Sequence, residues 1–288
     1  MSLTAFALTA GLGTRLRPYT EKLAKPAIPF LGVPLGLHSL RHLEELSVRR
    51  LYMNLHHAPE SLRAMDTSML NLPMPEFVDE TAKILGSGGA VANVIRDITT
   101  EQILLLNGDE VYLPQRSDVL RQALAEHTKR DRLATLVTMS HPEVGRSLGG
   151  AWAEANGIVR QFSKTPVTGL TGHHYVGYLF MNRRVERYFE FPVREENILY
   201  ETLTRGMAAG EDVAVHDHTA DWFETGRTDL FLQSTREVLD LVEQKKEDPA
   251  MRDLLQFLSR FPEPRFLLET EEPDLRRRIE RLWITSKG

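Results

Sequence analysis

Strands and helices alternate over the first 140 residues, and this alternation constrains the fold more than any other feature of the sequence. Short apolar runs predict strands at 5–9, 50–55, 76–78, 102–106 and 132–139. Helical spacing of apolar residues predicts helices between them at 35–46, 60–70, 89–97 and 117–127, the last with Ser117 as N-cap. Such a rhythm is typical of a parallel sheet with helices on both faces and right-handed crossovers.

The pattern changes after about residue 145. Short strands are expected at 151–154, 158–162, 175–181 and 212–216, and helices at 196–209 and 229–244. We read the first three of these strands as antiparallel additions to the open end of the sheet. The sequence therefore predicts an α/β fold with a Rossmann-like, doubly wound, mixed but mainly parallel sheet. A first domain would cover residues 1–244, and the charged tail at 245–288 would form a helical C-terminal extension.

Composition excludes several classes of protein. The chain has 35 basic and 40 acidic side chains and a formal net charge of −5, which argues against a sequence-independent nucleic-acid binder. It has no cysteine, so thiolate chemistry and cysteine-bound zinc are excluded. No apolar run approaches the roughly 18 residues that a membrane span requires, and we expect a cytoplasmic protein that binds neither nucleic acid nor membrane.

A glycine-rich loop follows the first predicted strand. Gly11 and Gly13 allow backbone N–H groups to approach an anion closely, and Arg15 and Lys25 add two cations. This set suits a triphosphate. It is not the dinucleotide fingerprint, because Leu16 stands where the third glycine would be, and no GK[ST] follows as in a P-loop. A tight turn with solvated charges is the alternative from spacing alone.

The loop is part of a longer motif that resembles a known family. Residues 11–20 read GLGTRLRPYT, and Lys25-Pro26 and the segment GVPL at 32–35 follow. This is similar to the signature of the sugar-1-phosphate nucleotidyltransferases, or NDP-sugar pyrophosphorylases. Later segments resemble further motifs of that family in the same order: Leu85-Gly86-Ser87-Gly88-Gly89, Asn107-Gly108-Asp109, Phe162-Ser163-Lys164-Thr165-Pro166 and Trp222-Phe223-Glu224-Thr225-Gly226. The stretch MNLHHAPESL resembles the subgroup of mannose-1-phosphate guanylyltransferase-like and N-acetylmuramate-1-phosphate uridylyltransferase-like enzymes.

The resemblance, which covers roughly residues 3–240, implies a fold, a reaction and a set of site residues. The fold is that of the nucleotide-diphospho-sugar transferases. The reaction joins an NTP to a sugar 1-phosphate with Mg²⁺ and releases pyrophosphate, and Arg15 and Lys25 would be the catalytic cations. The nucleotide would be bound by Ala10, Gly11, Gly13, Thr14, Gly86, Gly88 and Gly89. The sugar phosphate would be bound by Lys164, Gly177 and Glu196, and the metal by Asp109 and Glu224. Self-association is left open.

Three departures from the family pattern keep an alternative open. Glu224 stands where the family usually has Asp, with Asp221 nearby as a substitute ligand. Tyr175 replaces an asparagine that would contact the sugar, and Arg227 replaces a threonine. The alternative is a catalytically weakened nucleotide-sugar-binding or regulatory homologue. A nicotinamide dehydrogenase would rest on the two loop glycines alone.

Overall fold

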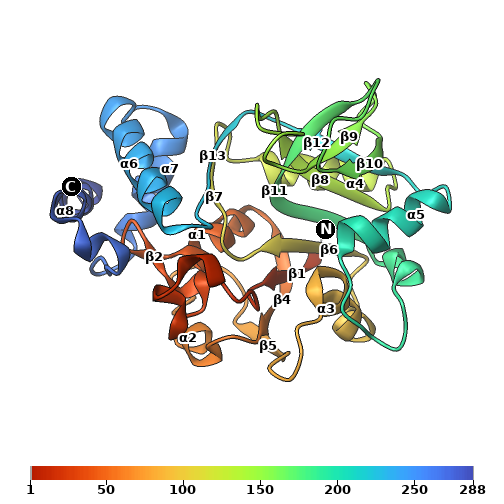
Figure 1. The fold of residues 1–288 in the computed structure, drawn as a ribbon, viewed down its shortest axis with the longest axis horizontal. Helices are drawn as coiled ribbons and strands as arrows, with labels where there is room; N and C mark the ends of the chain where they lie inside the picture. The colour runs from red at the N-terminus through yellow and green to blue at the C-terminus, as the bar shows by residue number, and fades with distance from the viewer. Residues whose placement is uncertain (1, 288) are drawn as a thin grey trace.

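The computed structural model describes residues 2–287, and a mixed β-sheet runs through their centre (Figure 1). Seven strands form its main run in the order β5-β4-β1-β6-β11-β8-β12. Their bounds are β1 Ser2–Leu8, β4 Ser47–Leu55, β5 Pro75–Asp79, β6 Gln102–Asn107, β8 Ala134–Met139, β11 Thr171–Asn182 and β12 Val213–Asp217. Among these seven, β11 runs antiparallel to both of its neighbours and the other six run parallel. The expectation of a mixed, mainly parallel sheet is confirmed.

Helices cover both faces of the sheet because side chains of each strand alternate between the faces. In β1, Leu3, Ala5 and Ala7 belong to one apolar cluster and Phe6 to the other. α3 and the turn at Ile198–Leu203 cover the Phe6 face, and the remaining large helices cover the opposite face. The helices are α1 Leu35–Leu40, α2 Pro59–Arg63, α3 Gly86–Val94, α4 Val119–Lys129, α5 Thr204–Ala208, α6 Thr228–Gln244, α7 Pro249–Ser259 and α8 Pro273–Ser286.

Smaller strands extend this framework. β9 (Gly150–Ala153) pairs with the first residues of β11, and β10 (Val159–Ser163) pairs with β9; both pairs are antiparallel, as expected. β2 (Pro29–Phe30) and β3 (Val33–Pro34) form a short hairpin. β7 (Val111–Pro114) pairs with β13 (Ala220–Phe223) in a separate two-stranded sheet that the sequence did not predict. This pair matters for function, because it joins the segment after Asp109 to the segment before Glu224.

Three local predictions differ from the structure. The helix expected at 60–70 ends at Arg63, and the Asp66 carboxylate then accepts from Ser68 N at 2.9 Å, which closes a turn. Ser117 is not the cap of α4, since Asp118 occupies the cap position and pairs with Arg116 instead. The helix expected at 196–209 begins as a π-type turn, where Asn197 accepts from two backbone N–H groups.

The C-terminal extension packs on the rest of the chain. In Figure 1 the blue helices α7 and α8 gather beside the red segment around β2. Trp283 is 4% exposed, and its indole N–H donates to Leu31 O at 2.8 Å. A Cβ on Gly32 would lie 2.6 Å from Pro264 Cβ, so the extension approaches this backbone closely. The residues of α7 and α8 thus complete the same apolar cluster that α1 and α4 line.

Within residues 2–287, none of the helices combines the length and the apolar character that crossing a membrane requires.

Candidate active site

A pocket of about 370 Å³ lies at the carboxyl ends of β1 and β6. Ligands of open α/β sheets bind at this edge. The residues around the pocket come from well-separated parts of the chain. They are Leu8, Thr9, Gly11, Leu12, Gly13, Thr14, Arg15, Lys25, Pro26, Ile84, Asp109 and Gly226. The structure therefore brings the glycine loop, Lys25, the Asn107–Asp109 motif and the last motif around one pocket.

The glycine loop is bent back on itself and open on its outer side. Gly13 has a φ of 59°, and a Cβ there would lie 2.9 Å from Thr20 Cγ2. Thr20 Oγ1 donates to Gly13 O at 2.8 Å, which fixes the bend. A Cβ on Gly11 would meet no atom within 4 Å, so its backbone faces free space. This geometry leaves room for an anionic ligand on the Gly11 side of the loop.

A buried network that sequence reasoning missed holds the start of this loop. Asn54, at the end of β4, accepts from Thr9 N at 2.6 Å and from Ala10 N at 3.2 Å. Its amide donates to Glu80 at 3.0 Å, and Glu80 accepts from Leu85 N at 3.1 Å. Burial raises the pKa of Glu80 above its ordinary value. The network joins the two segments predicted to bind the nucleotide.

The glycines at 86–89 pack against the segment around Glu196. Gly88 N donates to Glu196 O at 2.8 Å, and a Cβ on Gly86, whose φ is 68°, would approach the same carbonyl at 2.6 Å. The Glu196 side chain is buried, and its carboxylate pairs with Arg205 and accepts from Thr202 at 2.5 Å. Glu196 therefore supports the glycine turn from behind, and the structure does not bring it to the pocket.

Lys25 and Asp109 form an ion pair at the pocket. The Lys25 Nζ lies 2.7 Å from Asp109 Oδ2, and the two side chains are 14% and 33% exposed. Thr225 Oγ1 donates to the backbone oxygen of Asp109 at 3.1 Å. Lys25, predicted to be a catalytic cation, thus lies next to Asp109, which is predicted to hold the metal.

Glu224 and Arg15 meet at Gly226. Glu224 Oε1 accepts from Gly226 N at 2.7 Å, and a Cβ on Gly226 would lie 2.8 Å from Arg15 Nη2. Arg227 forms an ion pair with Asp229, in which Nη2 lies 2.6 Å from Oδ2. Asp221 lines a different pocket of about 440 Å³ and is not brought to Asp109. Arg15 and Gly226 thus line the pocket, and Glu224 lies directly behind Gly226 without lining the pocket itself.

Glu110 is a second residue that sequence reasoning missed. Burial, and the nearby Asp109 charge, raise its pKa above its ordinary value. Its carboxylate accepts from Asn107 Nδ2 at 2.8 Å and from Trp222 Nε1 at 2.7 Å. Gly177, predicted to bind the sugar phosphate, lies against this side chain, and a Cβ there would be 2.5 Å from Glu110 Cγ. A third polar residue, directly after the Asn107–Asp109 motif, was the available signal.

Lys164 stands beside a second, smaller pocket. It is exposed and forms no ion pair with any other residue between 2 and 287. A Cβ on Gly149 would lie 3.1 Å from Tyr200 Oη and 3.7 Å from Lys164 Cγ. The adjoining pocket of about 180 Å³ is lined by Leu136, Leu148, Gly149, Gly150, Ala151, Phe162, His174, Tyr175, Leu199 and Tyr200.

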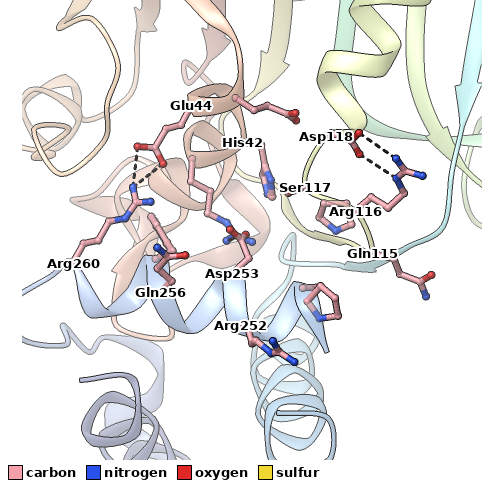
Figure 2. Close-up of a pocket in the computed structure, with 16 residues that line it drawn as sticks. His42, Glu44, Gln115, Arg116, Ser117, Asp118, Arg252, Asp253, Gln256 and Arg260 are labelled. Atoms are coloured by element: carbon pink, nitrogen blue, oxygen red, sulfur yellow. Dashed lines mark hydrogen bonds and ion pairs between the residues drawn. The ribbon is translucent and has the colours of Figure 1, made fainter. Parts of the chain in front are cut away.

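A larger pocket, of about 750 Å³, lies elsewhere, between residues 41–45, the loop after β7 and α7 (Figure 2). Its charged groups pair with one another. Arg260 binds Glu44 at 2.7 Å, and Arg116 binds Asp118 at 3.1 Å, as the dashed lines in Figure 2 show. None of the predicted site residues lines it. The pocket at the glycine loop, although smaller, is therefore the candidate active site.

Comparisons with known proteins identify the family of the chain. Residues 4–240 match a family model described as nucleotidyl transferase. The mannose-1-phosphate guanylyltransferase catalytic subunit beta of Drosophila melanogaster is 23% identical over 246 residues, which are 84% of this chain and 64% of that protein. The mannose-1-phosphate guanylyltransferase of Mycobacterium tuberculosis is 26% identical over 256 residues, which are 86% of this chain and 67% of that protein. The chain spans about two thirds of the length of these curated relatives.

A solved structure shows the same fold. The UDP-glucose pyrophosphorylase from Acinetobacter baumanii superposes with a TM-score of 0.70 at 15% identity, covering 88% of this chain and 99% of that one. The family model covers more than half of the chain and includes every motif gathered around the glycine loop. The chain belongs to the nucleotidyl transferase family.

Proposed function

We propose that this protein joins an NTP and a sugar 1-phosphate to give an NDP-sugar and pyrophosphate. The observation that carries the proposal is the gathering of Arg15, Lys25, Asp109 and Glu224 around the pocket at the glycine loop. Two cations and two carboxylates beside free backbone suit phosphoryl chemistry, in which positioning and charge neutralisation do most of the work.

The residues present fit a divalent cation, which we propose to be Mg²⁺. The family generally depends on a divalent metal. Carboxylate oxygens combined with phosphate oxygens are the ligands that Mg²⁺ prefers. Glu224 uses Oε1 for the bond to Gly226 N, which leaves Oε2 for a ligand. When bound by Asp109 and Glu224, the cation would neutralise phosphate charge.

The side chains have distinct roles in this proposal. The backbone around Gly11 and Gly13 holds the triphosphate. Lys25 draws the α-phosphate toward the attacking oxygen of the sugar phosphate, and Arg15 stabilises the charge that develops on the departing pyrophosphate. Bond formation to the α-phosphorus and loss of pyrophosphate occur in line. No protein nucleophile is needed, so the enzyme forms no covalent intermediate.

In this proposal the sugar 1-phosphate binds on the β11 side of the site, where Tyr175 and Tyr200 line the smaller pocket and Lys164 lies beside Gly149 at its edge. Supporting this placement, Lys164 has no carboxylate partner within the described part of the chain. The names of the relatives make GTP with mannose 1-phosphate the first pair to test.

The deciding experiment is pyrophosphate release with Mg²⁺ across a grid of NTPs and sugar 1-phosphates. The sugars should include mannose, glucose, N-acetylglucosamine, N-acetylmuramate and heptose phosphates. One productive pair, abolished in Asp109→Asn, is the expected result and identifies both the base and the sugar. Nucleotide binding with no pyrophosphate release from any pair would contradict the proposal and favour a catalytically weakened binding homologue.

A further inference from the structure

Glu110 is a largely buried carboxylate that the proposed reaction does not use. Its two oxygens accept one N–H bond each, from Asn107 at 2.8 Å and from Trp222 at 2.7 Å. Among residues 2–287 it forms no ion pair. A carboxylate without a cation partner costs stability when it is desolvated, so its two N–H partners are the contacts that hold it in place.

These contacts belong to a set of hydrogen bonds around Glu224, which we call the clamp. It joins Trp222 to Glu110 and Thr225 to Asp109. Trp222, two residues before Glu224, donates to the Glu110 side chain. Thr225, one residue after it, donates to Asp109 O at 3.1 Å. The strand pair β7 and β13 continues the connection, since Phe223 lies opposite Val111. Hydrogen bonds on both sides of Glu224 therefore tie its position to that of Asp109.

The surroundings of Glu110 are built to keep its side chain in one place. Ser39 Oγ accepts from Glu110 N at 2.8 Å and donates to Glu110 O at 3.1 Å. On the other side, Gly177 has a φ of 90° and no side chain, and any Cβ there would collide with Glu110. Backbone and side chain are thus both fixed, and the orientation of the carboxylate toward Trp222 follows.

We propose that Glu110 is a positioning residue that sets the separation of the Asp109 and Glu224 carboxylates, and through it their affinity for a divalent cation. The inference rests on the proposed function, because that function assigns the two carboxylates to the cation. Glu110 sets this separation through its hydrogen bond with Trp222 and through the backbone that joins it to Asp109. Partners of this kind, one layer behind the ligands, change metal affinity or activity by about 10–100-fold when they are removed.

Glu110→Met is the sharpest variant. A thioether is only a weak acceptor, so both hydrogen bonds of the Glu110 side chain are lost while its volume hardly changes. Trp222→Phe removes one of these two bonds from the opposite side. We expect each variant to weaken Mn²⁺ binding by about 10–100-fold, measured by electron paramagnetic resonance titration of the protein without substrate.

A second readout separates positioning from loss of structure. The half-saturating Mg²⁺ concentration for pyrophosphate release should rise by a similar factor, whereas KM for the NTP at saturating Mg²⁺ should stay within about twofold of the wild type. The double variant should bind Mn²⁺ little worse than Glu110→Met alone, because Trp222→Phe removes a bond that the Glu110 variant has already lost.

Trp152→Phe is the matched control. This indole also donates a hydrogen bond, to Ser163 O at 3.2 Å, but it joins β9 to β10. Mn²⁺ affinity should not change in this variant. Unchanged Mn²⁺ affinity in Glu110→Met, even with a lowered melting temperature, would overturn the inference while leaving the proposed function intact. Absence of Mn²⁺ binding to the substrate-free wild type would also overturn the inference, whereas the proposed function is tested separately by pyrophosphate release.

Discussion

Lys25 and Asp109 form an ion pair of 2.7 Å. In the proposed reaction each binds a different partner, Lys25 a phosphate and Asp109 a cation. A triphosphate with its cation would bring a negative charge to Lys25 and a positive charge to Asp109. Each side chain then exchanges one opposite charge for another, and neither is left unpaired. Because Asp109 is one third exposed, solvent screens the ion pair and keeps it weak enough to exchange.

Arg15 offers a test at the scale of one residue. Its guanidinium lies beside Gly226, at the rim of the pocket. Arg15→Ala removes a charged donor from the proposed path of the departing pyrophosphate, so we expect turnover to fall by about 10²–10³-fold, as when one donor is removed from an oxyanion site. Steady-state pyrophosphate release measures this.

Arg17→Ala is the control for that prediction. Arg17 is exposed, lies two residues further along and does not line the pocket. Its loss should change turnover less than threefold. Equal losses in the two variants would mean that general charge near the loop, and not Arg15, assists the reaction.

The site shows which residues a sequence can reveal. Arg15, Lys25 and Asp109 lie in motifs whose order and spacing are distinctive, and the structure gathers them at one pocket. Asn54 and Glu80 gave no such signal, because a single polar residue at the end of a strand is common. Their importance comes from two hydrogen bonds, one between residues separated by 45 positions and one between residues separated by 26 positions. No local sequence pattern encodes bonds of this kind.

Elements with strong periodicity were predicted well, and elements made by tertiary pairing were not. The first five residues of β6 are buried, and their sequence QILLL predicts a strand. β7 and β13 each have four residues and become strands through pairing with one another across more than 100 positions. The helix predicted at 60–70 shows the opposite error, because turn chemistry at Asp66 outweighed apolar spacing.

The last helix provides a prediction at the scale of elements. Trp283 is buried and bonds to Leu31 O. Trp283→Ala leaves a cavity and an unpaired carbonyl, so we expect the free energy of unfolding to fall by about 3–5 kcal/mol. Urea denaturation measures the loss.

The neighbouring residue on α8 is the control. Ile284 is 75% exposed, so Ile284→Ala removes little buried apolar surface. Its free energy of unfolding should stay within about 0.5 kcal/mol of the wild type. Similar small losses in both variants would mean that α8 contributes little to the core.

Buried ionisable groups make the stability of the whole molecule depend on pH. Burial raises the pKa of Glu269 to about 7, and its Oε1 has no hydrogen-bond partner among the described residues. As pH rises from about 4.5 to 7, this group ionises in the unfolded chain before it ionises in the folded one. The folded state then binds more protons, so stability is lost across this window as pH rises.

Glu269→Gln should remove that dependence. We expect the variant to be more stable than the wild type by up to roughly 3 kcal/mol at pH 8 and similar to it near pH 4.5. Urea denaturation at both pH values measures the difference. Glu263→Gln, at an exposed position in the same extension, should follow the wild-type profile. A Glu269→Gln profile parallel to that of the wild type would contradict this account.

The contact between Trp283 and Leu31 joins positions 252 residues apart. During translation at about 5–20 residues per second, Leu31 leaves the ribosome roughly 13–50 s before Trp283 does. The apolar surface around β2 and α1 stays uncovered through that interval, because α7 and α8 are its native cover. Apolar surface that is exposed during synthesis is prone to aggregation, so this part of the chain is most vulnerable before the last two helices pack on it.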